Sequence, residues 1–279
     1  MKTVGLLIAA RDTDEVWHSY ITAFERAVNT KPAPNYDPRP PGGAGGDPNL
    51  YATAAGQLVM DKVDVIVTAG ELAAEACKKA TNANRPPKPI PVVVASAGDL
   101  SKFAGSNVTG FTNGQVNTQI SDERIKIMNN RWNPIFVMVA GNDDVPPVKT
   151  AMDYVLGKLG NNKGYKISLK NKTDLTNLQA TLASQKKPNG MNVLYVCSDP
   201  FVRTNGTAIV QAAHALGMKT MHEFGEWHDK HKGDLCFGPD FKKLFQKAAG
   251  YVDQILADDK LATLPVVEAQ IGDCVQTPP

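Results

Sequence analysis

The stretch VDVIVTAGELAAEACKKAT, residues 63–81, decides the fold class. It begins with the apolar run Val63–Val67, passes through the small residues Thr68, Ala69 and Gly70, and continues with residues that favour a helix. An apolar run that leads through a short turn into a helix is typical of a buried strand in a parallel sheet. Backbone N–H groups at such a helix start are free and point beyond the strand, where an anion would be expected. The chain places Glu71 there instead.

The same pattern occurs at several other places along the chain. Apolar runs followed by polar turns are found at residues 3–24, 90–103, 135–160 and 192–217. Near-continuous apolar strands that alternate with helices predict a parallel sheet covered by helices on both faces. In such sheets the ligands gather beyond the carboxyl ends of the strands. The fold class is therefore α/β.

The repeated pattern is interrupted once, in the middle of the chain. After SNVTGFTN, residues 106–113, a helix is predicted over TQISDERIKIMNNRW, residues 118–132, and the pattern restarts at Ile135. Two successive sets of strand–helix units predict two similar lobes with a cleft between them. The segment PRPPGGAGGDP, residues 38–48, is predicted to be a surface loop, because its proline and glycine content suits neither a helix nor an inner strand.

Composition narrows the possible functions. The 279 residues carry a net charge of +2 without a basic stripe, so nucleic acid is not an expected partner. No apolar run approaches the roughly 20 residues that would cross a bilayer. The four cysteines form no CxxC pair, which argues against a zinc ribbon or a thioredoxin-type site. Cys77 and Cys197 are expected to be buried, whereas Cys236 and Cys274 could be bridged if the protein is exported.

Several of these stretches together resemble a known family. LVMDKVDVIVTAG (58–70), PIPVVVASAGDL (89–100), NVTGFT (107–112) and FGPDFKKLFQKAAGYVDQILADDKLATLPV (237–266) are similar to the ABC transporter substrate-binding proteins of the tryptophan/tyrosine type. The similar pieces occur in the family's order and span residues 1–267.

This resemblance implies a type I periplasmic binding protein, with two Rossmann-like lobes that are joined by a hinge and clamp a small ligand. We expect an N-terminal lobe of residues 1–113 plus 239–267 and a C-terminal lobe of residues 114–238 plus 268–279. The resemblance further implies a monomer without catalytic activity, cofactor or metal, which delivers an amino acid or small aromatic acid to the membrane permease of an ABC importer. It also implies a periplasmic or extracytoplasmic location, with the signal peptide removed from this chain.

The sequence departs from the family in three places. The proline- and glycine-rich loop replaces the second strand region, and HKGDLCFGPD (231–240) replaces a glycine-rich strand that contains tyrosine. The chain ends at IGDCVQTPP (271–279), where the family continues with a strand and a helix. Because cleft loops decide the ligand, these differences leave its identity open.

The turns after the predicted strands supply the candidate binding residues. Each turn carries an acid, and two bases, Arg11 and Arg203, lie among them, which suits a zwitterion or an amine. The alternative is that the acids only cap their helices. Trp17 is expected either to stack on the ligand or to pack in the core. The predicted ligand-binding residues are Arg11, Asp12, Thr13, Trp17, Thr68, Ala69, Gly70, Glu71, Ser96, Ala97, Gly98, Asn142, Asp143, Ser198, Asp199, Phe201 and Glu223.

Parts of the sequence are also compatible with two other functions. Asp12 lies in an Asp-x-Asp-x-Val pattern after a strand, as does the nucleophile of haloacid-dehalogenase-like phosphatases, which use Mg²⁺. A sensory domain with the same binding fold is a further alternative. His228 and His231 are expected in a polar surface loop rather than in a metal site.

Overall fold

The computed structural model describes residues 2–8, 15–29, 48–83, 89–160, 163–258 and 264–278. The predicted loop of residues 38–48 lies outside these residues apart from Pro48, which begins a helix. The chain divides into two compact units. The first comprises Met1–Asn113 and Phe241–Glu268, and the second comprises Gly114–Asp240 and Ala269–Pro279.

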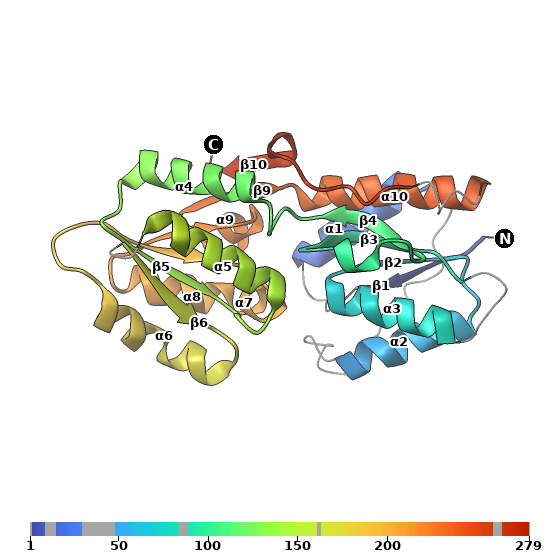
Figure 1. Ribbon diagram of the computed structural model, residues 1–279, viewed down its shortest axis with the longest axis horizontal. Helices are drawn as coiled ribbons and strands as arrows, with labels where there is room; N and C mark the ends of the chain where they lie inside the picture. The colour runs from blue at the N-terminus through green and yellow to red at the C-terminus, as the bar shows by residue number, and fades with distance from the viewer. Residues whose placement is uncertain are drawn as a thin grey trace. The chain divides into compact units, whose positions relative to one another are not determined.

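The first unit is a parallel sheet with helices on both sides (Figure 1). Its strands follow the order β1-β2-β3-β4, and every pair is parallel, as the repeated strand–helix pattern predicts. Its elements are β1 (Val4–Leu7), α1 (Glu15–Ala27), α2 (Pro48–Met60), β2 (Val65–Ala69), α3 (Glu71–Ala83), β3 (Val92–Ala97), η1 (Ser101–Phe103), β4 (Val108–Thr112) and α10 (Phe241–Asp258).

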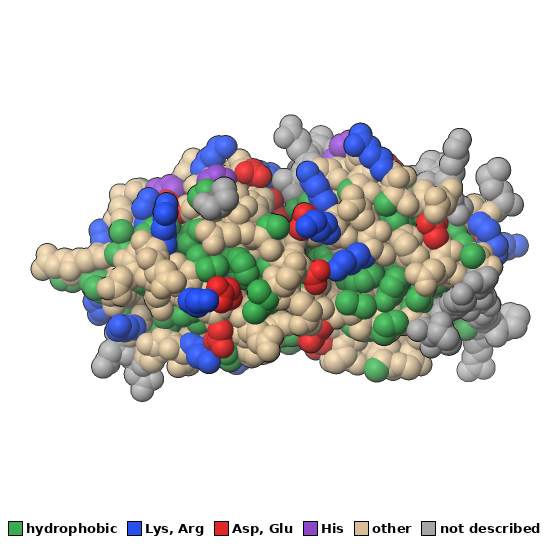
Figure 2. Space-filling model, turned by 90° about the horizontal axis from the view of Figure 1, so that it is seen from above, with side chains coloured by type: hydrophobic (Ala, Val, Ile, Leu, Met, Phe, Trp, Pro, Cys, Tyr) green, Lys and Arg blue, Asp and Glu red, His purple; other side chains and the backbone are tan. Residues whose placement is uncertain are grey.

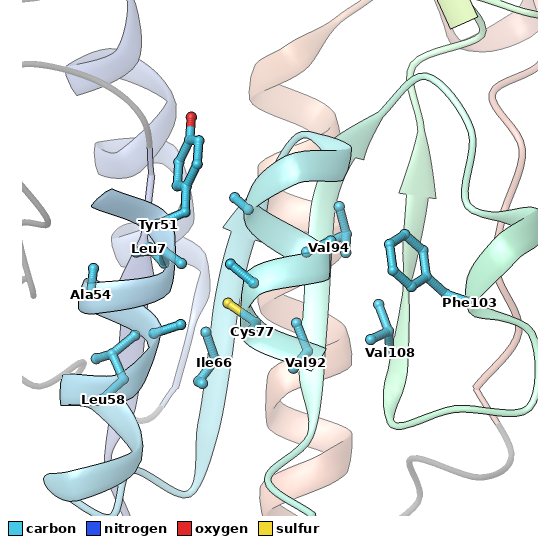
Figure 3. Packing of buried hydrophobic residues seen from close by; sticks show 14 of the residues in the cluster. Leu7, Tyr51, Ala54, Leu58, Ile66, Cys77, Val92, Val94, Phe103 and Val108 are labelled. Carbon is cyan, nitrogen blue, oxygen red and sulfur yellow. The ribbon is translucent and has the colours of Figure 1, made fainter. Parts of the chain in front are cut away.

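The core of the first unit lies between the sheet and the helices α2 and α3. Figure 3 shows Leu58 of α2 and Cys77 of α3 directed toward Ile66 of β2 and Val92 of β3. All residues of β2 and β3 are buried, which explains why these strands are apolar without alternation. Cys77 is fully buried, as predicted, and burial raises the pKa of its thiol.

Gly110 in β4 explains the glycine of the NVTGFT stretch. Its φ is +141°, and a Cβ placed there would lie 2.0 Å from the carbonyl oxygen of Val94 in β3. Only glycine lets the two backbones approach so closely. The register between β3 and β4 shifts beside this point, between Val94 and Ala97.

The second unit contains a larger, mixed sheet. The strand order is β10-β9-β8-β7-β5-β6, in which β10 runs antiparallel to β9 and the other pairs are parallel. Its elements are α4 (Thr118–Trp132), β5 (Phe136–Gly141), α5 (Pro146–Leu159), β6 (Gly164–Ser168), α6 (Lys172–Gln185), β7 (Asn192–Val196), α7 (Pro200–Thr204), α8 (Gly206–His214), β8 (Lys219–His222), α9 (Glu226–His231), β9 (Leu235–Pro239), η3 (Ile271–Asp273) and β10 (Cys274–Thr277).

The helix boundaries of the second unit follow the local signals in the sequence. The predicted helix of residues 118–132 is confirmed as α4, which Asn117 caps by accepting hydrogen bonds from the N–H groups of Gln119 and Ile120. Pro146 lies in the first turn of α5, where its missing N–H costs no helical hydrogen bond. Asp199 caps α7 as predicted, by accepting a hydrogen bond from the N–H of Val202.

The segment around His228 was predicted wrongly. It was expected to be a polar surface loop, but it forms helix α9, and both Trp227 and His231 are buried against the unit. Trp227 supplies the reason, because a side chain with no exposed surface anchors this short helix. His231 lies edge-on to Trp227 with the ring centroids 5.1 Å apart.

The four cysteines are all free, so Cys236 and Cys274 are not bridged. They lie on the adjacent strands β9 and β10 but at different positions of the ladder. Cys236 pairs with Thr277, whereas Cys274 pairs with Pro239. The antiparallel register therefore keeps the two side chains apart.

Among the described helices, none combines the length and the hydropathy that a transmembrane span requires. On the face that Figure 2 shows, basic and acidic side chains are interspersed, without a broad region of one sign.

Candidate functional site

Apart from Trp17 in α1, the predicted ligand-binding residues fall into three groups in the structure. Arg11, Asp12 and Thr13 lie outside the described residues. A second group lies at the ends of the strands β2 and β3 of the first unit and in the turns after them, and a third follows β5, β7 and β8 of the second unit. Because the strands within each sheet are neighbours, the turns of each group lie at one edge of one sheet.

In the first unit, the turns after β2 and β3 are joined by backbone hydrogen bonds. Gly70, with a φ of +86°, donates from its N–H to the carbonyl of Ser96 at 2.7 Å. The N–H of Asn113 donates to the carbonyl of Ala97 at 2.7 Å, which ties the end of β4 to the same edge. Thr68 is buried, and its hydroxyl donates to the carbonyl of Leu7 at 2.6 Å. The Thr68 hydroxyl therefore makes its hydrogen bond within the sheet, between β2 and β1.

Glu71 has a contact that the sequence did not predict. Its Oε1 accepts a hydrogen bond of 2.8 Å from the backbone N–H of Asp99. The carboxylate of Asp99 in turn accepts from the N–H and the hydroxyl of Ser101, at 2.7 and 3.0 Å. Glu71 therefore fastens the start of α3 to the turn after β3, through a bond with the neighbouring turn and not with its own helix. Gly98 lies buried within that turn.

Trp17 lies in an aromatic cluster of the first unit. Its ring is edge-on to Tyr20 and Phe245, with centroid distances of 5.7 and 6.3 Å. Tyr20 stacks in turn on Phe241 and Phe245 of α10. These contacts fit the core-packing alternative for Trp17, and stacking on a ligand stays a prediction.

In the second unit, Asn142 and Asp143 follow β5 and point to different partners. Asp143 accepts a short hydrogen bond from the hydroxyl of Ser168 and forms ion pairs with Lys166 at 3.3 Å and Lys170 at 3.2 Å. These donors lower the pKa of Asp143 to about 2, with the Ser168 hydroxyl as the largest cause. Asp143 therefore joins β5 to the edge strand β6. Asn142 instead lies close enough to Asp199 to help lower the pKa of that carboxyl.

Beyond β7 and β8, buried polar groups form a connected network. The N–H of Ser198 donates to Oε2 of Glu223 at 2.8 Å. The side-chain amide of Gln115 donates to the same Oε2 at 3.1 Å and to the carbonyl of Ser198 at 2.7 Å. Arg124 of α4 lies 3.5 Å from Oε1 of Glu223, and its Nε donates to the carbonyl of Phe237 at 2.7 Å. Buried polar groups that are paired in this way fix the geometry of the turns around them.

Burial and hydrogen bonding have opposite effects on the pKa of the Glu223 carboxyl. Neither Glu223 nor Arg124 has any exposed side-chain surface. Burial raises the pKa of the Glu223 carboxyl, and Arg124, Ser198 and Gln115 oppose that rise. The Glu223 side chain was predicted to contact a ligand, but in the structure it is surrounded by donors from its own unit.

Asp199 differs from Glu223 in what surrounds it. Its Oδ1 accepts from the N–H of Val202 at 2.7 Å, whereas its Oδ2 is buried without a hydrogen-bond partner among the described residues. The hydroxyl of Ser198 is buried and likewise unpartnered within the described part of the chain. Burial raises the pKa of the Asp199 carboxyl. Phe201 follows in α7 and is partly exposed.

The sequence-based prediction missed Gln115 and Arg124. Arg124 lies on the buried face of α4 together with Ile120 and Met128, at helical spacing. A single arginine on an otherwise apolar helix face was the signal, because a buried guanidinium requires an anionic or carbonyl partner. Gln115 lies before α4 in a short connection, and no sequence signal marks it.

Metal-ligand clusters and surface hollows are two other kinds of potential binding site. No group of three or more potential metal ligands occurs among the residues that the structure describes. A surface hollow of about 680 Å³ in the first unit is lined by the second half of α3 and by η1, including Glu75, Lys79 and Lys102. Glu75 already forms ion pairs with Lys79 at 2.9 Å and Lys102 at 3.3 Å, which partly neutralise the basic charge of the hollow.

Solved structures show which proteins share this architecture. A conserved domain protein from Vibrio cholerae matches over 96% of this chain and 89% of its own, with a TM-score of 0.74 and 17% identity. An ABC domain from Streptococcus pneumoniae, in complex with L-tryptophan, matches over 99% and 91%, with a TM-score of 0.71 and 18% identity. An ABC transporter solute-binding protein from Agrobacterium vitis with bound D-fucose matches over 99% and 94%, with a TM-score of 0.66 and 16% identity.

The chain has the type I periplasmic binding protein fold. No protein-family model matches the sequence, and no curated protein matches it significantly. Within the type I periplasmic binding protein fold, one neighbour holds an aromatic amino acid and another holds a sugar. The fold therefore confirms the predicted architecture but does not name a ligand.

Proposed function

We propose that the chain is a solute-binding protein, which holds one small polar molecule beyond the carboxyl ends of its parallel strands. The observation that carries this proposal is the polar array after β5, β7 and β8, in which Asn142, Ser198, Asp199 and Glu223 come together. Glu223 is held by hydrogen bonds at Oε2 and by the ion pair with Arg124 at Oε1, whereas the Ser198 hydroxyl and Oδ2 of Asp199 have neither kind of partner among the described residues. A ligand would satisfy such atoms.

The proposed ligand is an amino acid or a small aromatic acid. The acids at these turns suit an amine, and the backbone N–H groups at the helix starts suit a carboxylate. The neighbour that binds L-tryptophan supports this class, and the neighbour that binds D-fucose supports a sugar as the competing class.

The proposed mechanism is binding without chemistry. The ligand would contact both units and favour a closed arrangement, because it gains contacts there that an open arrangement lacks. We propose that the closed form docks on the permease of an ABC importer outside the cytoplasm. A sensory protein would bind the ligand in the same way, so reconstitution with a permease and an ATPase separates transport from sensing.

The phosphatase alternative has little support at the acids that the structure describes. Asp143 and Asp144 lie in VAGNDDVP (139–146), which resembles the metal-binding acids of these phosphatases. They form ion pairs with Lys170 at 3.2 and 2.7 Å, so a lysine ammonium group lies where Mg²⁺ would be needed. Purified protein incubated with Mg²⁺ and phosphate esters should release no phosphate. Phosphate release that is lost in Asp12→Asn would favour the phosphatase.

A thermal-shift screen tests the binding proposal. Amino acids, their amine-free analogues, small aromatic acids and sugars are each added to the full chain. A ligand at one hundred times its dissociation constant stabilises the native state by about 2.7 kcal/mol, which raises the melting temperature by several degrees. A screen in which no compound raises the melting temperature would contradict the proposal.

Small-angle scattering tests the closure. With a saturating concentration of the compound found in the screen, the radius of gyration should be smaller than without it. An unchanged scattering profile under the same conditions would argue against closure while leaving binding itself intact.

A further inference from the structure

Two buried carboxylates of the second unit lie beside consecutive strands but differ in whether a cation accompanies them. Glu223 accepts hydrogen bonds from the Ser198 N–H and from Gln115 at Oε2, and its Oε1, which has no hydrogen bond among the described residues, lies 3.5 Å from Nη1 of Arg124 in an ion pair. Asp199 is only 5% exposed, and no cationic side chain among the described residues forms an ion pair with it. A buried carboxylate oxygen without a partner is costly, so its retention calls for an explanation, and a binding role is one such explanation.

The atoms left unpartnered are of the kind that an ammonium group satisfies. Oδ2 of Asp199 can only accept a hydrogen bond while the carboxylate is ionised, and the Ser198 hydroxyl can either accept or donate. Both residues lie just beyond β7, after Cys197, so the two side chains start from neighbouring positions at the carboxyl edge of the sheet. A carboxylate with a neighbouring hydroxyl offers two acceptors to a donor that carries several hydrogens and a positive charge.

The bond from Asp199 to α7 does not explain this arrangement. The cap uses Oδ1 alone, and an asparagine or serine at this position would cap the helix equally well. Burial raises the pKa of the carboxyl, whereas the N–H of Val202, the side chain of Asn142 and the N–H of Phe201 lower it, although none of these donors makes a hydrogen bond to Oδ2. The second carboxylate oxygen thus adds a burial cost that capping does not require.

We propose that Ser198 and Asp199 form an ammonium subsite, in which Oδ2 of Asp199 and the hydroxyl of Ser198 receive the protonated amino group of the ligand. This inference rests on the proposed solute-binding function and narrows its ligand to primary amines. Glu223 acts as a positioning residue, because its carboxylate holds the Ser198 backbone through Oε2.

Matched ligands provide the first part of the test. L-Tryptophan is compared with indole-3-propionate, L-phenylalanine with 3-phenylpropionate, and L-leucine with 4-methylpentanoate, each pair differing only in the amino group. Two amine-free polyols, myo-inositol and D-fucose, complete the panel. We expect binding by at least one amine and a loss of at least about thirtyfold in affinity for its amine-free partner.

Variants of the full chain provide the second part. Asp199→Asn keeps the size of the side chain and the helix cap but removes the charge, and the affinity for the amine should fall by about thirtyfold or more. Ser198→Ala removes only the hydroxyl, and the same affinity should fall by about fivefold to tenfold. Asp174→Asn is the matched control, because Asp174 of α6 also accepts a backbone hydrogen bond, from Lys170 at 2.8 Å, and its charge lies elsewhere in the same unit.

The melting temperature without ligand distinguishes a ligand-binding role of Asp199 from a purely structural one. Asp199→Asn removes a buried charge that no cation compensates, so its melting temperature should equal or exceed that of the wild type. Unchanged affinity in Asp199→Asn would show that Oδ2 faces only an ordered water and would overturn the inference. Equal binding of an amine-free partner, or binding of a polyol alone, would also overturn it while preserving the solute-binding function. If no compound in the panel binds, both proposals fail.

Discussion

Arg124 and Glu223 form an ion pair in which Nη1 and Oε1 are 3.5 Å apart and neither side chain has any exposed surface. The pair joins helix α4 to the end of strand β8, and Glu223 also accepts a hydrogen bond from the N–H of Ser198 in the turn after β7. The buried ion pair therefore helps to fix the position of the turn that carries Ser198 and Asp199.

Breaking this pair from one side should destabilise the second unit. Arg124→Met leaves Glu223 without its cation, and the free energy of unfolding should fall by about 3–5 kcal/mol. Urea denaturation measures this change. The double variant Arg124→Met with Glu223→Leu should recover much of the loss, because it also removes the second charge. A double variant that loses the sum of the two single losses would contradict a direct coupling.

The stability of the chain should fall as the solution is acidified, because of His222. Its ring is fully buried, stacks on Trp227 with centroids 4.3 Å apart, and has no hydrogen-bond partner among the described residues for either nitrogen. Burial lowers its pKa to about 3, with smaller contributions from His231 and His214, and Asp234 opposes them. The folded chain therefore keeps His222 neutral where the unfolded chain, with an ordinary pKa near 6.5, binds a proton.

The expected loss is confined to the window between pH 6.5 and pH 3. Within it, His222 should contribute a decrease of up to about 1.4 kcal/mol in unfolding free energy for each pH unit of acidification. Urea denaturation at several pH values should give a shallower slope for His222→Met than for the wild type. His18→Gln, at an exposed position in the first unit, is the control. Equal slopes for the wild type and His222→Met would rule out this role of His222.

Glu71 offers a test of what its contact with Asp99 does. Glu71→Gln keeps an Oε1 that can accept the hydrogen bond from the Asp99 N–H, so stability should change by less than about 0.5 kcal/mol. Glu71→Ala removes the acceptor and should cost about 1 kcal/mol. Both are measured by denaturation without ligand. Affinity that falls at least about thirtyfold in Glu71→Gln would instead support the predicted ligand contact.

The cysteines give a direct chemical prediction. Because all four are free, alkylation of the denatured, unreduced protein should label four thiols by mass spectrometry. Reducing agent should leave the melting temperature unchanged. Labelling of only two thiols would mean that a bridge forms in spite of the register between β9 and β10.

Much of the fold could be predicted from the sequence, because the strand–helix signals are local and strong. The apolar run of residues 63–67 and the helix of residues 118–132 both appear in the structure, as β2 and α4. Such segments need no knowledge of distant residues, since a buried parallel strand must be apolar and a helix must be capped. The segment around His228 failed because burial of Trp227 overrides its polar composition.

The candidate site was less accessible from the sequence. The turns could be found, since they follow the strands, but the partners of each side chain could not. Glu223 and Arg124 are 99 positions apart, and Glu71 bonds to a backbone N–H whose availability depends on the turn at Asp99. Pairings over such separations follow from the topology of the sheet. For that reason Asp143 and Glu223, which look equivalent in sequence, turn out to have different surroundings.

Isothermal titration calorimetry of the full chain, with the compound that gives the largest thermal shift, tests whether the chain binds a solute without converting it. We expect one molecule bound per chain, recovered unchanged by mass spectrometry after hours of incubation. Absence of binding by every compound in the panel, or conversion of the bound compound into a product, would contradict this expectation.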